Sequence, residues 1–251
     1  MDFFLSVVIA FSFFTFIPMP LIDWTPQRMK FVPLWLPLVG LVVGAMGWGL
    51  FSLLRWAGLS ALLSSVIMTL YTLAMTGGVH ADGLMDTADA YFSRRDTERK
   101  LEIMKDSRVG AFAVMTLAAV LLLKAGLYGQ AVESARFQPI TLMLIPVLSR
   151  SFQASMIYCF PYAKGEGLAA MYGRNPERRF LIVFVAWVTG ASALLAWLAG
   201  PWALVVPVAC VLYYVFYYFS CKKQFGGITG DVLGAFLELS ELVMLAVAVF
   251  I

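Results

Sequence analysis

Charged residues are scarce in this sequence, and that scarcity excludes a soluble domain. Asp, Glu, Lys and Arg make up 13% of the 251 residues, whereas hydrophobic residues make up 61%. Typical soluble domains are about 25% charged and about 45–50% apolar. The three cysteines are too few and too scattered for a disulfide-rich secreted scaffold. The composition also excludes a disordered tail or a nucleic-acid-binding arm, so we expect the apolar side chains to face lipid and expect no nucleic-acid partner.

The sequence also lacks the usual signatures of covalent catalysis and of nucleotide binding. It has no nucleophile elbow, Walker loop, dinucleotide fingerprint or paired-cysteine metal site. His80 is its single histidine. A lone histidine at a helix end is more often a hydrogen-bonding residue at the membrane interface than a metal ligand or a base. The chemistry must therefore be sought among the acidic residues.

Long apolar runs are what the sequence does have. A membrane-spanning helix needs about 20 mostly apolar residues, because the hydrocarbon layer is about 30 Å thick and each residue rises about 1.5 Å. Eight segments meet or approach that length: 2–20, 32–54, 59–79, 110–131, 139–160, 180–199, 201–221 and 231–251. The first lacks the features of a cleaved signal peptide, so we expect it to be retained as a span or as a segment that lies flat or re-enters the bilayer. These runs predict an all-α, polytopic membrane bundle with six to eight spans and a single domain, 1–251.

Basic residues alternate between successive loops. If all eight segments span, most of the 18 Lys and Arg residues fall in the loops after the first, third, fifth and seventh segments. Only Arg55, Lys124 and Arg136 belong to the opposite side, and Arg150 lies inside the fifth segment. By the positive-inside rule, the odd-numbered loops face the cytoplasm and both termini lie on the far side. We expect a multi-pass protein of a bacterial inner membrane, and we leave oligomerisation open.

Two pairs of glycines are spaced for close helix packing. Gly40 and Gly44 lie in one apolar segment, and Gly230 and Gly234 lie in another. Small residues four apart let two helix backbones approach closely. For the first pair we expect ordinary helix packing.

Acidic residues form two groups that do not follow the basic loops. The first group, Asp82, Asp86 and Asp89, lies in the run GGVHADGLMDTADAYF at 77–92, with no Lys or Arg until Arg94. Offsets of four and seven residues place the three carboxylates on one stripe of a helix. Three like charges on one stripe require a cation, and clustered carboxylates suit Mg²⁺ or Mn²⁺. The alternative is a solvated helix end, which the apolar neighbours of these residues make less suitable.

The second acidic group lies in the last apolar segment. Asp231 and Glu238 are seven residues apart, and Glu241 follows three residues later. An ionised carboxylate inside a bilayer is costly, so an acid in such a segment is by default a functional-site hypothesis. We expect Asp231 and Glu238 to point toward the first group and to complete a carboxylate cluster at the cytoplasmic mouth of the bundle. For Glu241 the structural alternative is an ion pair with a buried arginine such as Arg150.

Basic residues close to these acids are suited to binding phosphate. Lys105, Asp106 and Arg108 lie in the run LEIMKDSRVGAF at 101–112. Lys and Arg beside metal-binding acids share the charge of a phosphate group, although a solvated or headgroup-facing helix would also carry mixed charge. The loop at 161–179 holds a second basic group: Lys164, Arg174 and Arg178. This loop would hold an anionic substrate, or it would reflect the positive-inside bias alone.

The chain resembles the cobalamin synthase family, also called adenosylcobinamide-GDP ribazoletransferase or cobalamin 5′-phosphate synthase. The resemblance rests on GGVHADGLMDTADAYF, LEIMKDSRVGAF and GGITGDVLGAFLELSE, with FFTFIPMP near the start, and it extends over essentially the whole chain. The family is similar in logic to the CDP-alcohol phosphotransferases, whose signature pairs an Asp-Gly with further aspartates. In this sequence Asp82-Gly83 is followed by Asp86-Thr87 instead of Ala-Arg, and the later aspartate pair is absent. Phospholipid synthesis is therefore the alternative.

The resemblance implies the last assembly step of the cobalamin nucleotide loop. Adenosylcobinamide-GDP and α-ribazole, or its 5′-phosphate, would give adenosylcobalamin, or its 5′-phosphate, and GMP, with Mg²⁺ required. A ribose hydroxyl would attack the phosphorus attached to the cobinamide arm, so the site must neutralise a diphosphate and deprotonate an alcohol.

Read with this resemblance, the acidic and basic residues take roles in the reaction. The expected metal ligands are Asp82, Asp86, Asp89 and Asp231. The expected catalytic residues are Asp82, Asp89 and Glu238, with Asp89 or Glu238 as the general base. The expected substrate-binding residues are His80, Lys105, Asp106, Arg108 and Arg174. A cation-coupled or proton-coupled transporter is the alternative from another class, and its site would lie near the bilayer midplane.

Overall fold

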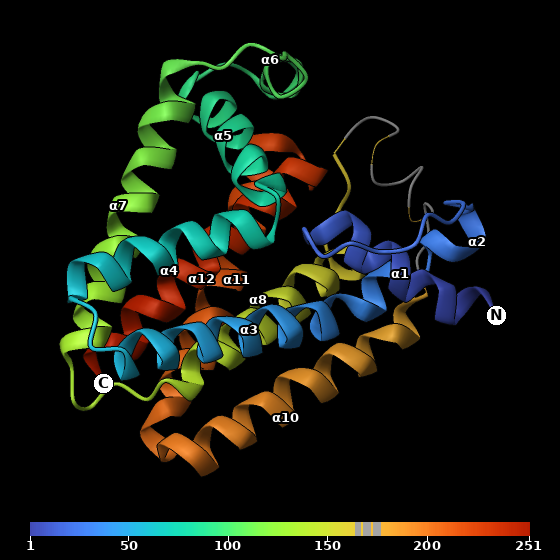
Figure 1. Cartoon of the computed structure of the whole chain (residues 1–251). Helices are drawn as coiled ribbons and strands as arrows, with labels where there is room; N and C mark the ends of the chain where they lie inside the picture. Colours follow the sequence, from blue (N-terminus) through green and yellow to red (C-terminus); the bar gives the residue numbers. More distant parts are fainter. Residues whose placement is uncertain (164–166, 168–171, 173–176) are drawn as a thin grey trace.

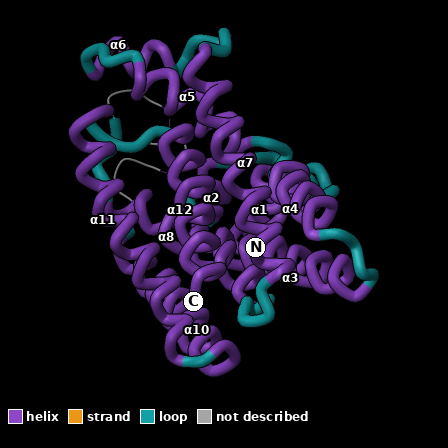
Figure 2. The backbone as a smooth tube through the Cα atoms, turned by 90° about the vertical axis from the view of Figure 1, so that its left-hand side faces the viewer, coloured by secondary structure: helices purple, strands orange, loops and turns teal. Residues whose placement is uncertain are grey.

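The protein is built from α-helices joined by short loops, as its computed structural model shows (Figure 1). The structure describes residues 1–163, 167, 172 and 177–251. The α-helices are α1 (Asp2–Phe14), α2 (Pro26–Met29), α3 (Val32–Trp56), α4 (Ala61–Met75), α5 (Val79–Phe92), α6 (Thr97–Ile103), α7 (Ala111–Glu133), α8 (Ile140–Cys159), α10 (Leu181–Ala199), α11 (Val205–Phe225) and α12 (Gly230–Phe250). Short 3-10 helices, η1 (Arg178–Phe180) and η2 (Pro201–Leu204), precede α10 and α11. Figure 2 shows helices throughout the described chain, which confirms the predicted all-α fold.

Six helices are long and apolar enough to cross a membrane: α3, α7, α8, α10 with η1, α11 with η2, and α12. Helices α8 and α12 form the centre of the bundle, because 72% and 67% of their apolar windows are buried inside the protein. Helix α10 lies at the periphery, with only 17% buried. The predicted polytopic membrane bundle is confirmed, with α8 and α12 as its core.

The first glycine pair packs α3 directly against α8. A Cβ on Gly40 would lie 2.2 Å from the carbonyl oxygen of Pro146, and a Cβ on Gly44 would lie 2.1 Å from that of Met143. No side chain fits at either distance. Gly40 and Gly44 therefore serve helix packing, as predicted.

Helix α1 is too short to form a span, which leaves the alternative that this segment lies flat or re-enters the bilayer. Its 13 residues rise only about 20 Å, which is less than the thickness of the hydrocarbon layer. Its first residue, Asp2, pairs with Arg28 at 3.0 Å, and the Trp35 indole at the start of α3 donates to the carbonyl oxygen of Phe3. The start of α1 is thus fixed beside the start of α3. The expectation that the N-terminus lies across the bilayer from Arg28 was wrong, because α1 does not carry the chain to the other side.

The third predicted span also differs, because α4 ends early and the chain turns sharply. Helices α4 and α5 meet at an angle of 90°, and they form a broken span or a re-entrant pair. Gly77 and Gly78 lie at the break with φ values of +59° and +77°. This left-handed backbone conformation favours glycine, which has no Cβ. The turn sends α5 away from the direction of α4, as Figure 1 shows.

The segment between α5 and α7 is fastened to the start of α12. Helix α6 lies at the top of both Figure 1 and Figure 2, next to the end of α5. Lys100 of α6 donates a hydrogen bond to Gln224 at the end of α11. The Thr229 hydroxyl, which caps α12 by accepting from the Val232 N–H, lies 3.9 Å from the sulfur of Met104. These contacts place the motif at 101–112 beside the N-terminus of α12.

Candidate active site

Helices α5 and α12 cross so closely that only glycine fits at the crossing. A Cβ on Gly83 of α5 would lie 2.8 Å from the carbonyl oxygen of Asp231 and 2.9 Å from its Cα. A Cβ on Gly234 of α12 would lie 3.2 Å from the carbonyl oxygen of His80. The crossing brings Asp82 to the first turn of α12, where Asp231 lies. The two acidic stretches therefore meet here, as the sequence predicts.

Asp82, Asp86 and Asp231 form what we call the aspartate site. The negative charges of Asp82, Asp89 and Asp231 all act on Asp86 and repel its own charge. Within the described residues, none of the three members forms an ion pair with a lysine or an arginine. Asp231 also lies in the first turn of α12, where free N–H groups favour negative charge. The aspartate site therefore holds concentrated negative charge, which suits a cation.

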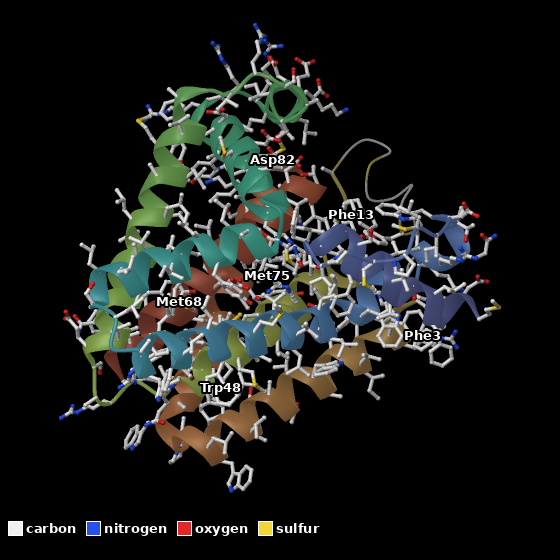
Figure 3. All side chains as sticks on the ribbon, in the orientation of Figure 1. Phe3, Phe13, Trp48, Met68, Met75 and Asp82 are labelled. Carbon is white, nitrogen blue, oxygen red and sulfur yellow. The ribbon has the colours of Figure 1, made fainter. Side chains whose placement is uncertain are left out.

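A cavity of about 160 Å³ lies beside the aspartate site, between α1, α5, α8 and α12. Asp82 and Asp231 line it together with His80 and Gln153. Figure 3 shows Asp82 on α5 and Phe13, another lining residue, on the neighbouring α1. His80 is only 2% exposed. The single histidine is thus part of the wall of this cavity.

Asp89, the third acid of the predicted stripe, is turned toward α7. Its carboxylate accepts hydrogen bonds from the backbone N–H groups of Gly110, at 2.7 Å, and Ala113, at 2.8 Å. A Cβ on Gly110 would lie 2.5 Å from either carboxylate oxygen, so a larger residue there would displace the Asp89 side chain. Asp89 therefore caps α7 and holds it against α5. Its roles as metal ligand and general base stay predictions.

Glu238 does not point toward the aspartate site, so the predicted orientation was wrong. Its carboxylate pairs with the Lys124 ammonium at 2.5 Å, and the two side chains are 8% and 3% exposed. The physical reason is that Lys124 lies inside α7, where it neutralises a buried acid of α12. The charge count placed Lys124 in a loop on one side of the membrane, so the sequence did not indicate it as a partner of Glu238. A catalytic role for Glu238 would require it to act from this ion pair.

Glu241 pairs with Arg150, which is the structural alternative that the sequence left open. The guanidinium lies 2.7 Å from the carboxylate, and the Ser149 hydroxyl donates to the same carboxylate at 2.8 Å. Lys124, Glu238, Arg150 and Glu241 form what we call the ion-pair cluster. The cluster surrounds a cavity of about 30 Å³, which is distinct from the cavity at the aspartate site.

The predicted phosphate-binding residues lie on the surface near the start of α7. Arg108 donates to Asp106 at 2.6 Å, and its side chain is 88% exposed. These hydrogen bonds lower the pKa of Asp106 to about 2. Asp106 thus orients Arg108, and Lys105 beside it is exposed. Arg174 lies outside the described residues.

Two polar residues of these cavities escaped the sequence analysis as site residues. Gln153 lies in the apolar fifth segment and Lys124 lies in the fourth. A polar side chain inside an apolar run is itself a signal, because burying it without a partner is unfavourable. The sequence prediction used this signal for the acidic residues only. Gln153 and Lys124 show the same signal.

The donors of the aspartate site fit Mg²⁺ by their chemistry. Hard divalent cations prefer carboxylate oxygens, and Mg²⁺ is commonly held by one or two carboxylates together with substrate phosphates and water. In the described part of the chain, no three His, Cys, Asp or Glu side chains converge into a metal site made by protein alone. Two of these three carboxylates would thus supply part of a coordination shell, and a bound diphosphate and water would supply the rest.

Comparisons with known proteins agree with the motifs. The model of the cobalamin-5-phosphate synthase family matches residues 6–249. The adenosylcobinamide-GDP ribazoletransferase of Clostridium botulinum strain Alaska E43 is 32% identical to this chain, over 96% of the chain and 95% of the relative. Relatives of the same name from Geobacillus sp. strain WCH70 and Stutzerimonas stutzeri strain A1501 are 37% and 35% identical, covering 92% and 96% of the chain and 90% and 96% of their own lengths.

No solved structure matches the chain. The family match nevertheless spans nearly all of the sequence, and the relatives are matched over nearly their full lengths. The chain therefore belongs to the cobalamin-5-phosphate synthase family of enzymes.

Proposed function

We propose that this enzyme joins adenosylcobinamide-GDP to α-ribazole or its 5′-phosphate, and that it releases GMP in a reaction that requires Mg²⁺. The names of its relatives support the two substrates. The observation that carries the proposal is the crossing of α5 and α12, which brings Asp82 and Asp231 together at one cavity. A phosphoryl transfer needs such a concentration of carboxylates to hold a metal and to receive a proton.

The reaction exchanges one phosphate ester bond for another. A ribose hydroxyl oxygen bonds to the phosphorus that carries the cobinamide arm, and the bond from that phosphorus to the oxygen of GMP breaks. Asp82, which lines the cavity, accepts the hydroxyl proton. Asp86 and Asp231 would hold Mg²⁺, which would neutralise part of the charge of the diphosphate. Arg108, held by Asp106, together with Lys105 and Arg174, binds phosphate oxygens.

Asp82 is assigned as the proton acceptor because Asp89 and Glu238, the two bases that the sequence favours, have other partners. Asp89 accepts two backbone N–H groups, and Glu238 is paired with Lys124. A general base must instead be free to contact the substrate hydroxyl. Among the described residues, Asp82 has no ion-pair partner and it borders the cavity.

The site is proposed to face the cytoplasm of a bacterial cell, at the inner membrane. The basic residues of the segment between α5 and α7 support this orientation through the positive-inside rule. The aspartate site lies at the same end of α12 as that segment, because Thr229 contacts Met104. The position also disfavours a transporter, whose substrate site would lie closer to the bilayer midplane.

Turnover by the purified protein tests the proposal. Wild-type protein in lipid nanodiscs is expected to convert adenosylcobinamide-GDP and α-ribazole to adenosylcobalamin and GMP with Mg²⁺, and to stop in EDTA until Mg²⁺ is restored. Asp82→Asn is expected to lose activity by a factor of about 10²–10⁴ if it accepts the proton. The matched control is Asp23→Asn, an exposed aspartate in the loop after α1.

Each result bears on a separate part of the proposal. Wild-type protein that forms no product would refute the function and favour a transporter. Full activity in EDTA would refute the metal requirement alone. Wild-type rates in Asp82→Asn would remove the proton acceptor but leave the reaction in place.

A further inference from the structure

The cavity beside the aspartate site contains buried polar groups without partners. Neither ring nitrogen of His80 has a hydrogen-bond partner within the described residues. Gln153 is 3% exposed, and its amide donates to the carbonyl oxygen of Leu233 at 3.0 Å. Its own oxygen, Oε1, lacks a partner in the same described set. Buried polar groups are normally satisfied, so these atoms are available to a molecule bound in the cavity.

Most of the remaining cavity wall is apolar and partly aromatic, and Tyr172 adds a phenol to it. Phe13, Phe14, Leu36 and Ile157 line it. The ring of Phe14 lies within 9° of parallel to the His80 imidazole, with 5.8 Å between the ring centroids. An apolar cavity of about 150 Å³ binds a benzene ring, so this cavity of about 160 Å³, which is partly open, encloses one aromatic ring and leaves the rest of a larger base at its open side. The wall therefore suits a flat aromatic group that carries few polar atoms.

The geometry points to this cavity as the binding site for the aromatic base of ribazole, an inference that rests on the proposed function. That base is a dimethylbenzimidazole, which has two fused rings, two methyl groups and one free ring nitrogen that accepts a hydrogen bond. An N–H of His80 donates to this nitrogen, since a neutral imidazole has one donor and one acceptor. Phe13, Phe14 and Leu36 cover the rings and the methyl groups. Gln153 Oε1 accepts a hydrogen bond from a ribose hydroxyl.

The other bases in the substrates match this wall less well. Guanine and adenine carry several donors and acceptors around their edges. The few polar side chains of the wall cannot pair with all of these atoms, and the rest would be buried against Phe13, Phe14 and Ile157 without partners, which is unfavourable. Dimethylbenzimidazole has only one such atom to satisfy, so the apolar wall selects it.

The same placement explains how the ribose would meet the carboxylates. Asp82 and Asp231 line the cavity that contains His80 and Gln153. A ribose is joined directly to its base, so a base held at His80 leaves the sugar beside the two carboxylates. The hydroxyl that attacks would then lie next to Asp82, the proposed proton acceptor. His80 and Phe14 are therefore specificity-determining residues, and they position the nucleophile.

Two ligands that differ at one ring atom test the hydrogen bond from His80. The probes are α-ribazole and the corresponding α-riboside of dimethylindole, which replaces the free ring nitrogen by C–H. Wild-type protein in nanodiscs, measured by isothermal titration calorimetry, is expected to bind α-ribazole about tenfold more tightly, as one hydrogen bond predicts. His80→Leu, which keeps the approximate volume, is expected to bind the two ligands equally. An equal affinity of wild-type protein for both ligands would overturn the inference.

A second variant tests the aromatic wall of the cavity. Its matched control separates a loss of binding from a loss of folding. Phe14→Ala is expected to weaken binding of both ligands about tenfold. The matched control is Phe11→Ala, which lies on the same helix and is 9% exposed, against 8% for Phe14, but does not line the cavity. Phe11→Ala is expected to bind both ligands within twofold of wild type. If Phe14→Ala and Phe11→Ala behave alike, the cavity does not hold the base.

Steady-state kinetics separate this inference from the proposed function. In His80→Leu, the KM for α-ribazole is expected to rise about tenfold, while the KM for adenosylcobinamide-GDP stays within twofold of the wild-type value. A rise in the KM for adenosylcobinamide-GDP alone would assign the cavity to a purine base and refute the inference while leaving the reaction intact. Wild-type protein that binds α-ribazole with this ring preference but forms no product would refute the reaction and retain the cavity assignment.

Discussion

Two acidic regions on the same helix, α12, have opposite surroundings. Glu238 and Glu241 lie within the helix and are neutralised by Lys124 and Arg150. Asp231 lies in the first turn, beside other aspartates and without a described ion pair. Figure 3 shows this separation along the chain. Asp82, near Asp231, lies on one side of the break between α4 and α5. Met68, which lines the cavity of the ion-pair cluster, lies on the other side. An acid in a membrane helix therefore indicates function only when no buried lysine or arginine pairs with it.

The difference follows from the cost of charge in an apolar environment. A buried charge that loses its partner costs several kcal/mol, whereas a complete pair is close to neutral in its effect on stability. The ion-pair cluster therefore ties α7 and α8 to α12. The aspartate site stores repulsion among its carboxylates that a bound cation would relieve. Substitutions in the two regions should consequently affect different properties.

The largest expected effect on stability is at Lys124. Lys124→Met leaves Glu238 buried without a cation, so the free energy of unfolding should fall by about 3–5 kcal/mol. Unfolding in mixed detergent micelles, followed by circular dichroism, measures the change. The double variant Lys124→Met with Glu238→Leu removes both charges and should recover most of the loss. Equal destabilisation in the single and double variants would contradict a mainly electrostatic role.

Asp231 should show the reverse behaviour. Asp231→Asn is expected to lower kcat by a factor of about 10²–10³, as the loss of an electrostatic group in a phosphoryl-transfer site does. Its unfolding free energy should stay unchanged or rise, because repulsion with Asp82 and Asp86 is removed. Glu238→Gln is the comparison, and it should lose stability before activity. A strongly destabilised Asp231→Asn with near wild-type turnover would reverse the distinction between the regions.

The helix crossing offers a smaller steric test. Gly83→Ala places a methyl group 2.8 Å from the Asp231 carbonyl oxygen, so α5 and α12 must separate. We expect a loss of about 1–3 kcal/mol in unfolding free energy and a clear fall in kcat, because Asp82 and Asp231 move apart. Gly126→Ala in α7 is the control, since no atom lies within 4 Å of its added Cβ. That control should be neutral or stabilising by up to about 1 kcal/mol.

Substitutions of Asp89 should give the smallest effect. They test whether Asp89 belongs to the aspartate site. Asn has one acceptor oxygen where Asp89 uses two, so Asp89→Asn should lose one of the two hydrogen bonds, cost less stability than Asp89→Ala, and keep most of the activity. Asp89→Ala removes both acceptors for Gly110 and Ala113 and should cost about 1 kcal/mol. Thermal unfolding and turnover measured on both variants check this. A stable but inactive Asp89→Asn would restore Asp89 as the general base.

Local sequence patterns predicted helices and their close packing well. The spacing of Asp82, Asp86 and Asp89 indicated one helix, and α5 spans all three. Gly40 and Gly44 indicated a close helix contact, and they pack on α8. These features depend on neighbouring residues and on the helical period, which a single sequence contains.

Partners distant in the sequence were harder to predict. Nothing near Glu238 indicates that Lys124, on another helix, neutralises it. Asp89 shares a stripe with Asp82 but is turned to the start of α7, because the Gly110 and Ala113 N–H groups lie there. Tertiary contacts decide these orientations, and helical periodicity contains no information about them.

The anchoring of α1 has a practical consequence for reporter fusions. Asp2 and Phe3 are tied to Arg28 and Trp35, so a reporter joined before Met1 would share a compartment with the loop that precedes α3. With α4 and α5 taken as one crossing, an odd number of crossings separates that loop from Ile251. Reporters on the two ends of the chain would therefore sense different compartments, with only the amino-terminal one sharing the compartment of the cavity beside Asp82 and Asp231.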